Sequence, residues 1–514
     1  MLPDVFRMED SFLLRVFGRG RFSSLIFSVL VLGLVITALN IWQLSSLQAQ
    51  HYLQEHGTPE GQPDPENGQT YVVYARHPDT GYLQHVYNVL DRAGYRRGSY
   101  NTSSDWDLMW AHDYPFKKIK DKMLAMKKGQ RINKFPGSGF ITNKVNLATS
   151  GIKNVPPAFS IPGEKGQLLK YARRFPDKLF VQKSNNHRGI QIQGLSDLDL
   201  TTEGSFVQEY ISNPFLVDGY KFDIGIYTTL TSIDPLRIYV HHSDALLRFC
   251  PEKYHPFDAR NKNKYVVQDD YLPSWKIPSF SKYMKELGFS FTDTLNTYIR
   301  GLGKDPANMW EEMYSTIAEV YLKHEEMFIK AMSHYPHKEA FFEMVRFDFV
   351  LDENLNVFLM EANMSPNLSS AHFPANKLLY EQVIHSVLKL VGVVQGSIRW
   401  DLLHPAGNAA NDMVVANKDV MTFPELCSSP QCQETSSCNL ENCDLCLKCL
   451  KESDLDMLKA AWKEQVNRHA TRRIFPVPPS RVNSTQVRGT LSKSNWKMQR
   501  WFQGKCNMDI NWCS

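Results

Sequence analysis

The sequence has little net charge and contains no internal repeat. Its 58 Lys and Arg nearly balance 54 Asp and Glu, which leaves a formal charge of +4 over 514 residues. Proteins that bind nucleic acid carry a marked basic excess, so nucleic acid is excluded as an expected partner. A hydrophobic content of 43% and a charged content of 22% are ordinary for a globular protein. The function must therefore be sought in local sites.

Charged residues are missing altogether from residues 22–44, which are mostly apolar. About 20 such residues span a bilayer core, whereas a cleaved signal has a shorter core of roughly 7–15 residues, so we expect a retained transmembrane helix. Arginines precede this stretch, and no Lys or Arg follows it until Arg76. The positive-inside rule then predicts a cytosolic N-terminus and a luminal location, in the ER or Golgi, for the folded domains. An inverted topology with cytosolic domains is the alternative.

Cysteine is nearly absent before the C-terminal region: Cys250, in the middle of the chain, is the only one. A dense, even set of cysteines in a non-cytosolic segment is typical of disulfides, whose connectivity the spacing does not give. Zinc is the alternative, because the tail contains a C-x2-C-x2-C run. The charges flanking the apolar stretch favour disulfides, and three glycosylation sequons permit a luminal location. The eight tail cysteines are Cys427, Cys432, Cys438, Cys443, Cys446, Cys449, Cys506 and Cys513, and the sequons begin at Asn101, Asn367 and Asn483.

The order of predicted elements indicates an α/β (α+β) protein. A β-branched run at 71–77, a helical pattern at 81–95 and a further strand predict an N-terminal strand–helix–strand module. Strands and helices then alternate up to about residue 395. We therefore divide the chain into a cytosolic segment (1–21), a transmembrane helix (22–44), a Gly- and Pro-rich stalk (45–70), an α/β module (71–130), a main domain (131–395) and a Cys-rich region (396–514).

Polar residues interrupt two neighbouring apolar runs. "FLMEANMSP" contains Glu361 and Asn363, and the preceding run "EMVRFDFVLD" contains Asp348. A short polar turn separates the runs, which predicts a β-hairpin. Alternate residues of a strand share a face, so Glu361 and Asn363 lie together and Asp348 can project beside them. Two carboxylates and an amide suit Mg²⁺, which leaves coordination positions for nucleotide phosphates.

Basic residues lie where they could meet such phosphates. Lys183 ends the predicted strand "LFVQKS" and is followed by the polar loop "NNHRGI", which contains Arg188 and Gly189. A lysine at a strand end reaches phosphate as a point charge, and a glycine-containing loop can cover it. Three further charged residues follow on predicted strands: Lys221, Asp223 and Arg248.

The ordered set of motifs resembles the tubulin–tyrosine ligase-like family, whose members have the ATP-grasp fold. The resemblance rests on "INKFPGSGFITNKVNL" (132–147), the lysine strand with its R-G-I loop, "VQEYISNPFLVDGYKFDIGIYTTLTSIDPLRIYV" and "DFVLDENLNVFLMEANMSP". It covers roughly residues 130–390, and the motifs occur in the family's order. The chain is thus identified as a divergent, membrane-anchored member of this family.

The resemblance implies an ATP- and Mg²⁺-dependent ligase that adds a free amino acid, glutamate being favoured, to a protein carboxylate through an acylphosphate. The acceptor would be an acidic protein segment, tubulin by family resemblance. The resemblance also assigns roles to individual residues. It implies that Mg²⁺ binds Asp348, Glu361 and Asn363, that ATP binds Lys144, Lys183, Arg188, Gly189, Gln208, Glu209, Tyr210, Ile211, Lys221 and Asp223, and that Arg248, Lys221 and Asp223 act in catalysis.

The sequence departs from the family pattern at one notable position. The family has K-F-D-x-R where this chain has "KFDIG", so Gly225 stands at an expected Arg. Loss of one electrostatic contact to the phosphates lowers a rate by roughly 10²–10³-fold. A luminal pseudoenzyme that binds nucleotide or acidic protein without ligation is therefore the alternative function. Arg188, Arg237 and Arg248 are the arginines that we consider as substitutes.

Overall fold

The computed structural model describes residues 69–100, 105–184, 191–394, 415–478 and 491–513. Residues Gln69–Ser514 form one compact unit. The predicted membrane span, the stalk up to residue 68, Arg188, Gly189 and two of the sequons lie outside the described residues. Within the described part of the chain, no helix combines the length and the apolarity needed to cross a membrane.

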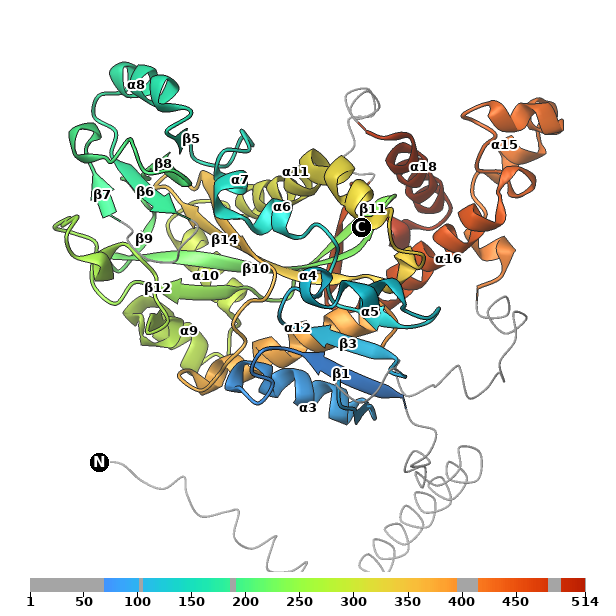
Figure 1. Cartoon of the computed structure of the whole chain (residues 1–514), viewed down its shortest axis with the longest axis horizontal. Helices are drawn as coiled ribbons and strands as arrows, with labels where there is room; N and C mark the ends of the chain where they lie inside the picture. The colour runs from blue at the N-terminus through green and yellow to red at the C-terminus, as the bar shows by residue number, and fades with distance from the viewer. Residues whose placement is uncertain (1–68, 101–104, 185–190, 395–414, 479–490, 514) are drawn as a thin grey trace, which may run out of the picture. The chain divides into compact units, whose positions relative to one another are not determined.

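The N-terminal module is a parallel four-stranded sheet, in the order β2-β1-β3-β4. Figure 1 shows its strands β1 and β3 beside helix α3. Helix α3 (Gln84–Arg92) connects its first strands and buries one face against α12 (Lys377–Leu390), so the predicted strand–helix–strand module is confirmed. Small helices follow it in the chain. The elements are β1 Thr70–Tyr74, β2 Arg96–Arg97, β3 Leu108–Ala111, β4 Arg131–Ile132, α4 Pro115–Lys118, α5 Lys120–Leu124, α6 Gly139–Thr142 and α7 Lys144–Ala148.

A second, antiparallel sheet has the order β5-β8-β6-β7. Helix α8 (Lys165–Arg174) packs on it, and Phe159, Leu168, Phe180 and Val207 form a small core of their own. Burial of these apolar side chains is what holds the two layers together. The strands are β5 Ala158–Ile161, β6 Phe180–Ser184, β7 Gln191–Gln193 and β8 Ser205–Glu209.

The largest sheet has eight strands and is built around the 14-residue strand β10. Strand β10 pairs antiparallel with β9, β11, β12 and β14, and β14 forms the predicted hairpin with β15. The long helix α11 (Ala307–Met332) packs against this sheet. The other elements are β9 Leu216–Val217, β10 Tyr220–Ile233, β11 Leu236–His241, β12 Leu246–Phe249, β13 Leu272–Pro273, β14 Glu343–Leu351, β15 Val357–Asn363, α9 Pro278–Lys285 and α10 Phe291–Gly301.

The Cys-rich region contributes to the same large sheet. Its strand β16 (Thr471–Phe475) pairs antiparallel with β11 and forms an edge of the sheet. The sequence did not lead us to expect this strand. Helices α15 (Pro424–Ser428), α16 (Glu452–Asn467) and α18 (Lys493–Met508) flank this strand in the chain. A separate apolar core, which includes Leu458 and Trp501, holds the region together.

All eight tail cysteines are joined in disulfides, as predicted, and Cys250 is free and buried. No group of three or more His, Cys, Asp or Glu side chains suited to a metal ion occurs among the described residues. The zinc alternative for the tail therefore finds no support in this part of the chain. The pairs are Cys427–Cys446, Cys432–Cys443, Cys438–Cys449 and Cys506–Cys513.

Candidate active site

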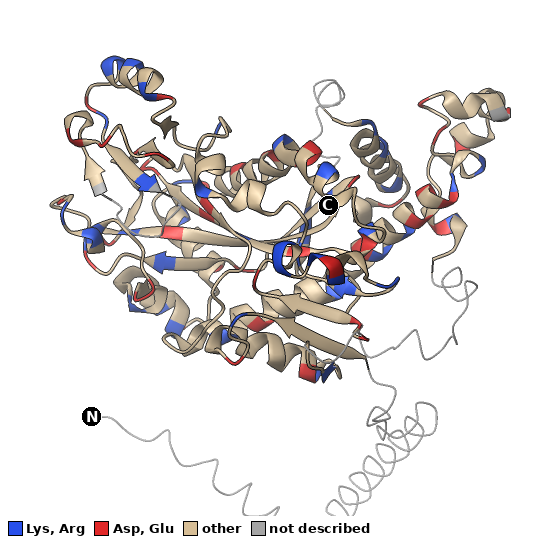
Figure 2. Ribbon diagram, viewed as in Figure 1, with Lys and Arg blue, Asp and Glu red and all other residues tan. Residues whose placement is uncertain are grey.

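Charged residues from four neighbouring strands lie on one face of the large sheet. Directly opposed residues of antiparallel strands point to the same side. The pairing sets Asp223 of β10 opposite Arg248 of β12, and Asp348 of β14 opposite both Gly225 of β10 and Glu361 of β15. Figure 2 shows acidic and basic positions along these inner strands, which are otherwise mostly uncharged. The register alone therefore assembles the row of polar groups.

Asp348 lies at the centre of this row and is 1% exposed. Arg346 donates from Nε to Oδ1 at 2.6 Å and from Nη2 to Oδ2 at 2.9 Å. Arg248 Nη2 and Asn363 Nδ2 each donate to Oδ2 at 3.0 Å. A buried carboxylate is stable only when paired and hydrogen-bonded, and these four bonds satisfy that requirement.

Arg248 also connects Asp348 to Asp223. It donates from Nε and Nη2 to the two carboxylate oxygens of Asp223 at 2.9 and 2.7 Å. Burial raises the pKa of Asp223 to about 6, Asp348 adds to this shift, and Arg248 opposes it. Two residues earlier on β10, Lys221 is buried and donates to the Tyr265 carbonyl at 3.0 Å. Burial leaves the positive charge of this lysine poorly solvated and therefore lowers its pKa.

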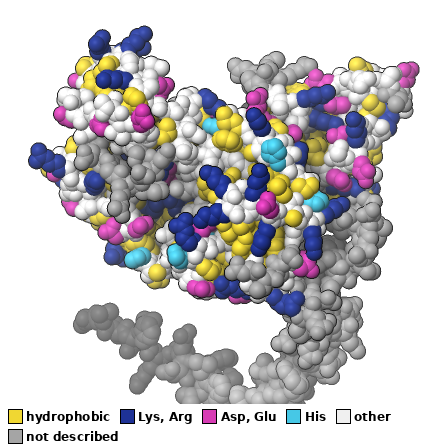
Figure 3. All heavy atoms as spheres, in the orientation of Figure 1, with side chains coloured by type: hydrophobic (Ala, Val, Ile, Leu, Met, Phe, Trp, Pro, Cys, Tyr) yellow, Lys and Arg dark blue, Asp and Glu magenta, His cyan; other side chains and the backbone are white. Residues whose placement is uncertain are grey.

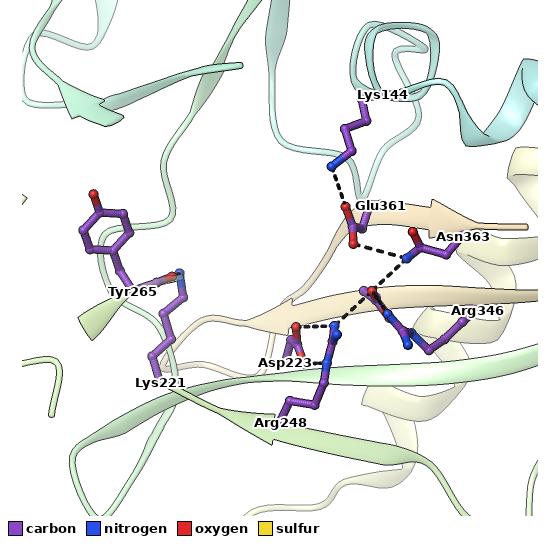
Figure 4. A network of polar contacts seen from close by, with 9 residues as sticks. Lys144, Lys221, Asp223, Arg248, Tyr265, Arg346, Glu361 and Asn363 are labelled. Atoms are coloured by element: carbon purple, nitrogen blue, oxygen red, sulfur yellow. Dashed lines mark hydrogen bonds and ion pairs between the residues drawn. The ribbon is translucent and has the colours of Figure 1, made fainter. Parts of the chain in front are cut away.

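Glu361 forms the more accessible end of the row. Its carboxylate pairs with Lys144 Nζ at 3.0 Å and accepts a bond from Asn363 Nδ2 at 3.2 Å (Figure 4). Lys144 begins helix α7, whose N-terminus is capped by the Asn143 side chain. Burial acts to raise the pKa of Glu361, but Lys144 and Asn363 outweigh it and hold the pKa at about 2. Glu361 is therefore ionised at neutral pH.

Lys183 belongs to the same electrostatic environment from the smaller sheet. Its Nζ donates to Gln208 Oε1 at 3.1 Å. Burial lowers the pKa of Lys183 to about 8, Glu361 opposes the shift, and the charges of Lys144 and Lys221 add to it. A lysine with a pKa of about 8 is still mostly charged at pH 7, so Lys183 can attract an anion such as a phosphate group.

The predicted adenine-binding segment, residues 208–211, comprises the end of β8 and the two residues that follow it. Glu209 accepts bonds from Tyr171 and Lys178, and its amide and that of Tyr210 donate to the carbonyls of Pro157 and Leu179. These two backbone amides are therefore already hydrogen-bonded within the protein. The Tyr210 ring lies under the Lys221 ammonium, 5.0 Å from Nζ to the ring centroid. The aromatic side chain thus connects the predicted adenine-binding segment to the charged row.

The donor set fits the magnesium ion that the sequence predicts. Asp348 and Glu361 are carboxylates joined through the Asn363 amide, which bonds to both. Mg²⁺ takes one or two carboxylates and keeps positions for water and phosphate, and the oxygen of an Asn side chain is a suitable ligand. The surrounding cations Lys144, Lys183 and Arg248 would compensate phosphate charge.

Most of the predicted site residues are brought together, and one important residue was missed. The described members cluster around β10, β14 and β15, with Lys183 and Gln208 approaching from the smaller sheet. Arg346 was not predicted, although its position two residues before Asp348 on the same strand was a usable signal. Arg237 does not belong to the site, because it is bound by Glu464 of α16.

Comparison with known proteins identifies the family to which the sequence is similar. The family model described as "Tubulin-tyrosine ligase family" matches residues 122–398. The "Probable tubulin polyglutamylase ttll-15" of Caenorhabditis elegans is 39% identical over 442 residues, which cover 84% of each chain. The "Tubulin polyglutamylase TTLL6" of Mus musculus is 28% identical over 313 residues, covering 57% of this chain and 37% of the relative.

The "Tubulin monoglutamylase TTLL4" of Homo sapiens is 28% identical over 311 residues, covering 57% of this chain and 25% of the relative. The chain thus spans most of the nematode relative but only about a quarter to two fifths of the mouse and human relatives. The family match covers more than half of the chain and includes the whole row from Lys144 to Asn363. The chain therefore belongs to the tubulin-tyrosine ligase family.

Proposed function

We propose that this chain is an ATP- and Mg²⁺-dependent ligase that adds an amino acid to a protein carboxylate. The observation that carries the proposal is the row of acids on one sheet face, Asp223, Asp348 and Glu361, with Lys144 and Arg248 bonded to it. Such alternation holds a divalent cation and a polyphosphate together, because each charge has a counter-charge nearby. An ATP-grasp arrangement, with the nucleotide between the smaller and the larger sheet, accounts for the approach of Lys183.

The reaction has two balanced steps. An acceptor carboxylate oxygen attacks the γ-phosphorus of ATP, the bond to the β–γ bridging oxygen breaks, and ADP leaves, which gives an acylphosphate. The amine of the incoming amino acid then attacks the acyl carbon, phosphate leaves, and the nitrogen loses a proton to give an amide. Mg²⁺ would neutralise phosphate charge during the first step.

The chain's own residues would position and neutralise the reactants. Asp348, Glu361 and Asn363 would hold the metal ion, and Lys144 and Lys183 would contact phosphate oxygens as point charges. Arg248 presents a guanidinium next to Asp223 and Asp348, where it would stabilise negative charge on the acylphosphate. Lys221 and Asp223 would line the nucleotide side, next to the Tyr210 ring.

Glutamate is the amino acid that we propose, and an acidic protein segment is the acceptor. The names of the relatives support this choice, since they are called polyglutamylases and a monoglutamylase of tubulin. The surface supports the acidic acceptor independently, because six lysines around α4 and α5 are exposed and Figure 3 shows basic side chains gathered over this region. An acidic segment would be attracted by them. They are Lys117, Lys118, Lys120, Lys122, Lys127 and Lys128.

We further propose that the protein is anchored by residues 22–44 and that its folded part is luminal. Four disulfides support this location, because disulfides persist in oxidising compartments. A glycosidase treatment of the protein from cells should increase its gel mobility, and the combined changes Asn101→Gln, Asn367→Gln and Asn483→Gln should abolish the shift. No shift would favour the inverted topology and cytosolic tubulin as the acceptor.

The alternative function is that of a pseudoenzyme that binds nucleotide or acidic protein without ligation. Two observations favour it: two guanidiniums already bind Asp348, and Gly225 replaces the expected Arg. In that case the Arg346–Asp348 pair would take the place of the metal ion rather than assist it.

Incorporation of labelled amino acid separates the two functions. The purified full chain would be incubated with ATP, Mg²⁺, labelled glutamate and a panel of acidic proteins that includes tubulin, with labelled glycine and tyrosine in parallel. We expect label from glutamate to appear in an acidic acceptor only when ATP and Mg²⁺ are present. Absence of incorporation for all three amino acids, in a preparation that binds ATP, would support the pseudoenzyme.

A further inference from the structure

Gly225 is the position at which this chain departs from its family, and its surroundings explain how a small residue is accommodated. Its backbone does not adopt the left-handed conformation that favours glycine, so local geometry does not require it. A Cβ atom placed on Gly225 would lie 2.9 Å from Arg346 Cδ, 3.2 Å from Asp348 Oδ1 and 3.4 Å from Arg346 Nε. The space next to Gly225 is thus filled by the Arg346 side chain.

The register places Arg346 where a side chain from position 225 would otherwise act. Gly225 lies directly opposite Asp348, and Arg346 lies two residues from Asp348 on the same face of β14. An arginine at position 225 would start directly opposite the Asp348 carboxylate. Arg346 reaches that same carboxylate from the neighbouring strand, through two hydrogen bonds. The guanidinium is present, but β14 supplies it instead of β10.

We propose that Arg346 is the arginine of the nucleotide-phosphate site in this chain and that Gly225 is the gap that makes room for it. The inference rests on the proposed function, since it assigns a residue to that same site. Arg346 is 6% exposed and lies one strand from Glu361 and Asn363, so its charge acts in a poorly solvated environment. Its fork-shaped guanidinium can hold Asp348 and still present an N–H to a phosphate oxygen.

Exchange of the two residues gives the sharpest test. Arg346→Gln removes the charge and keeps most of the side chain, and a double variant with Gly225→Arg and Arg346→Gly returns the guanidinium to β10. Arg472→Gly is the matched control, because Arg472 lies on β16 of the same sheet and pairs with Glu311, outside the site. Binding of ATP and of adenosine to each full-length variant would be measured calorimetrically with excess Mg²⁺, and thermal unfolding would be followed in parallel.

We expect Arg346→Gln to weaken ATP binding by about ten- to a hundredfold, because one charge-assisted contact to phosphate is lost. Adenosine binding should stay unchanged, since adenosine has no phosphate. The double variant should bind ATP within about threefold of the natural chain. Gly225→Arg alone should not strengthen binding, because its side chain must displace Arg346.

Several results would overturn the inference. One is ATP binding by folded Arg346→Gln that is as tight as, or tighter than, that of the natural chain, which is expected if Arg346 only blocks Asp348. Equal losses for ATP and adenosine would indicate a purely structural role. A double variant that fails to fold, or that folds without regaining ATP affinity, would also refute the exchange of the two residues. If Arg346→Gln does not fold, ATP binding by the double variant alone decides whether the inference holds.

The outcome is separable from that of the proposed function. A chain that binds ATP through Arg346 but incorporates no amino acid leaves this inference standing and refutes the ligase. If the natural chain ligates glutamate and Arg346→Gln binds ATP normally, the ligase stands and the inference about Arg346 is refuted. If the natural chain binds no ATP, both fail.

Discussion

Two buried carboxylates, Asp348 on strand β14 and Glu464 on helix α16, each accept four hydrogen bonds, yet their surroundings differ. Glu464 receives two from Arg237 and one each from Tyr239 and Thr231. One cation neutralises one anion, and the side chains of Arg237 and Glu464 are 6% and 10% exposed. The cluster is closed, and it attaches α16 to β11.

The cluster at Asp348 shares its donors with further acids. Arg248 also binds Asp223, and Asn363 also binds Glu361. It ends at the pair of Lys144 and Glu361, whose side chains are 27% and 32% exposed. Complete hydrogen bonding therefore does not distinguish a structural cluster from a functional one. Sharing of charges and an accessible end do, because they allow a metal ion or a phosphate to replace existing partners.

The largest expected effect is on the closed cluster. Glu464→Gln should lower the free energy of unfolding by about 3–5 kcal/mol, because it leaves the Arg237 charge buried and uncompensated. Urea unfolding of the full chain measures this change. Asp456→Asn, at an exposed position on the same helix, is the control and should stay within about 0.5 kcal/mol. The native fraction of Glu464→Gln should bind ATP normally, and weakened binding would contradict the division into two clusters.

The next effect is on the open cluster and has the opposite character. Glu361→Gln should reduce the rate of ATP-dependent ligation by about 10²–10³-fold, because a metal-holding carboxylate is lost. Its melting temperature should change by only a few degrees, since Glu361 is partly exposed. Glu353→Gln, exposed in the turn of the same hairpin, is the control. Equal activities of the two variants would refute the assignment of Glu361.

A smaller effect concerns pH. The pKa of Lys183 is lowered to about 8, so its positive charge is present below pH 8 and is lost as the pH rises through that value. ATP affinity should therefore fall by up to about tenfold between pH 7 and pH 9.5. Lys183→Arg should flatten this dependence, because an arginine stays charged throughout. Calorimetric titration at several pH values would show it, and a flat profile for the natural chain would exclude Lys183 from phosphate binding.

The clustering of Asp348, Glu361 and Asn363 could be predicted from the sequence because it depends on local periodicity. Glu361 and Asn363 are two residues apart on one strand, and the short turn of the hairpin brings Asp348 opposite them. Spacing along β14 could have indicated that Arg346 lies near Asp348. That its side chain fills the space next to Gly225 could not be predicted, because Gly225 belongs to a strand more than 100 residues earlier.

Strand β16 escaped prediction for a related reason. Its sequence "TRRIF" carries two adjacent arginines, which is atypical of a buried strand. Arg473 is nonetheless completely buried, since it bonds to Gln465 and stacks 3.6 Å from the Phe502 ring centroid. These partners come from two separate helices and are recognisable only in the folded chain.

The pairing of β16 with β11 has a consequence for the making of the protein. About 230 residues separate the two strands in the chain, so at roughly 5–20 residues per second the ribosome needs roughly 10–45 s to supply the second one. During that time the outer side of β11 is an open edge, which can pair with another chain. A protein shortened to the family match at 122–398 would keep this edge permanently. The solubility of the full-length protein therefore depends on the last tenth of the chain, which supplies β16.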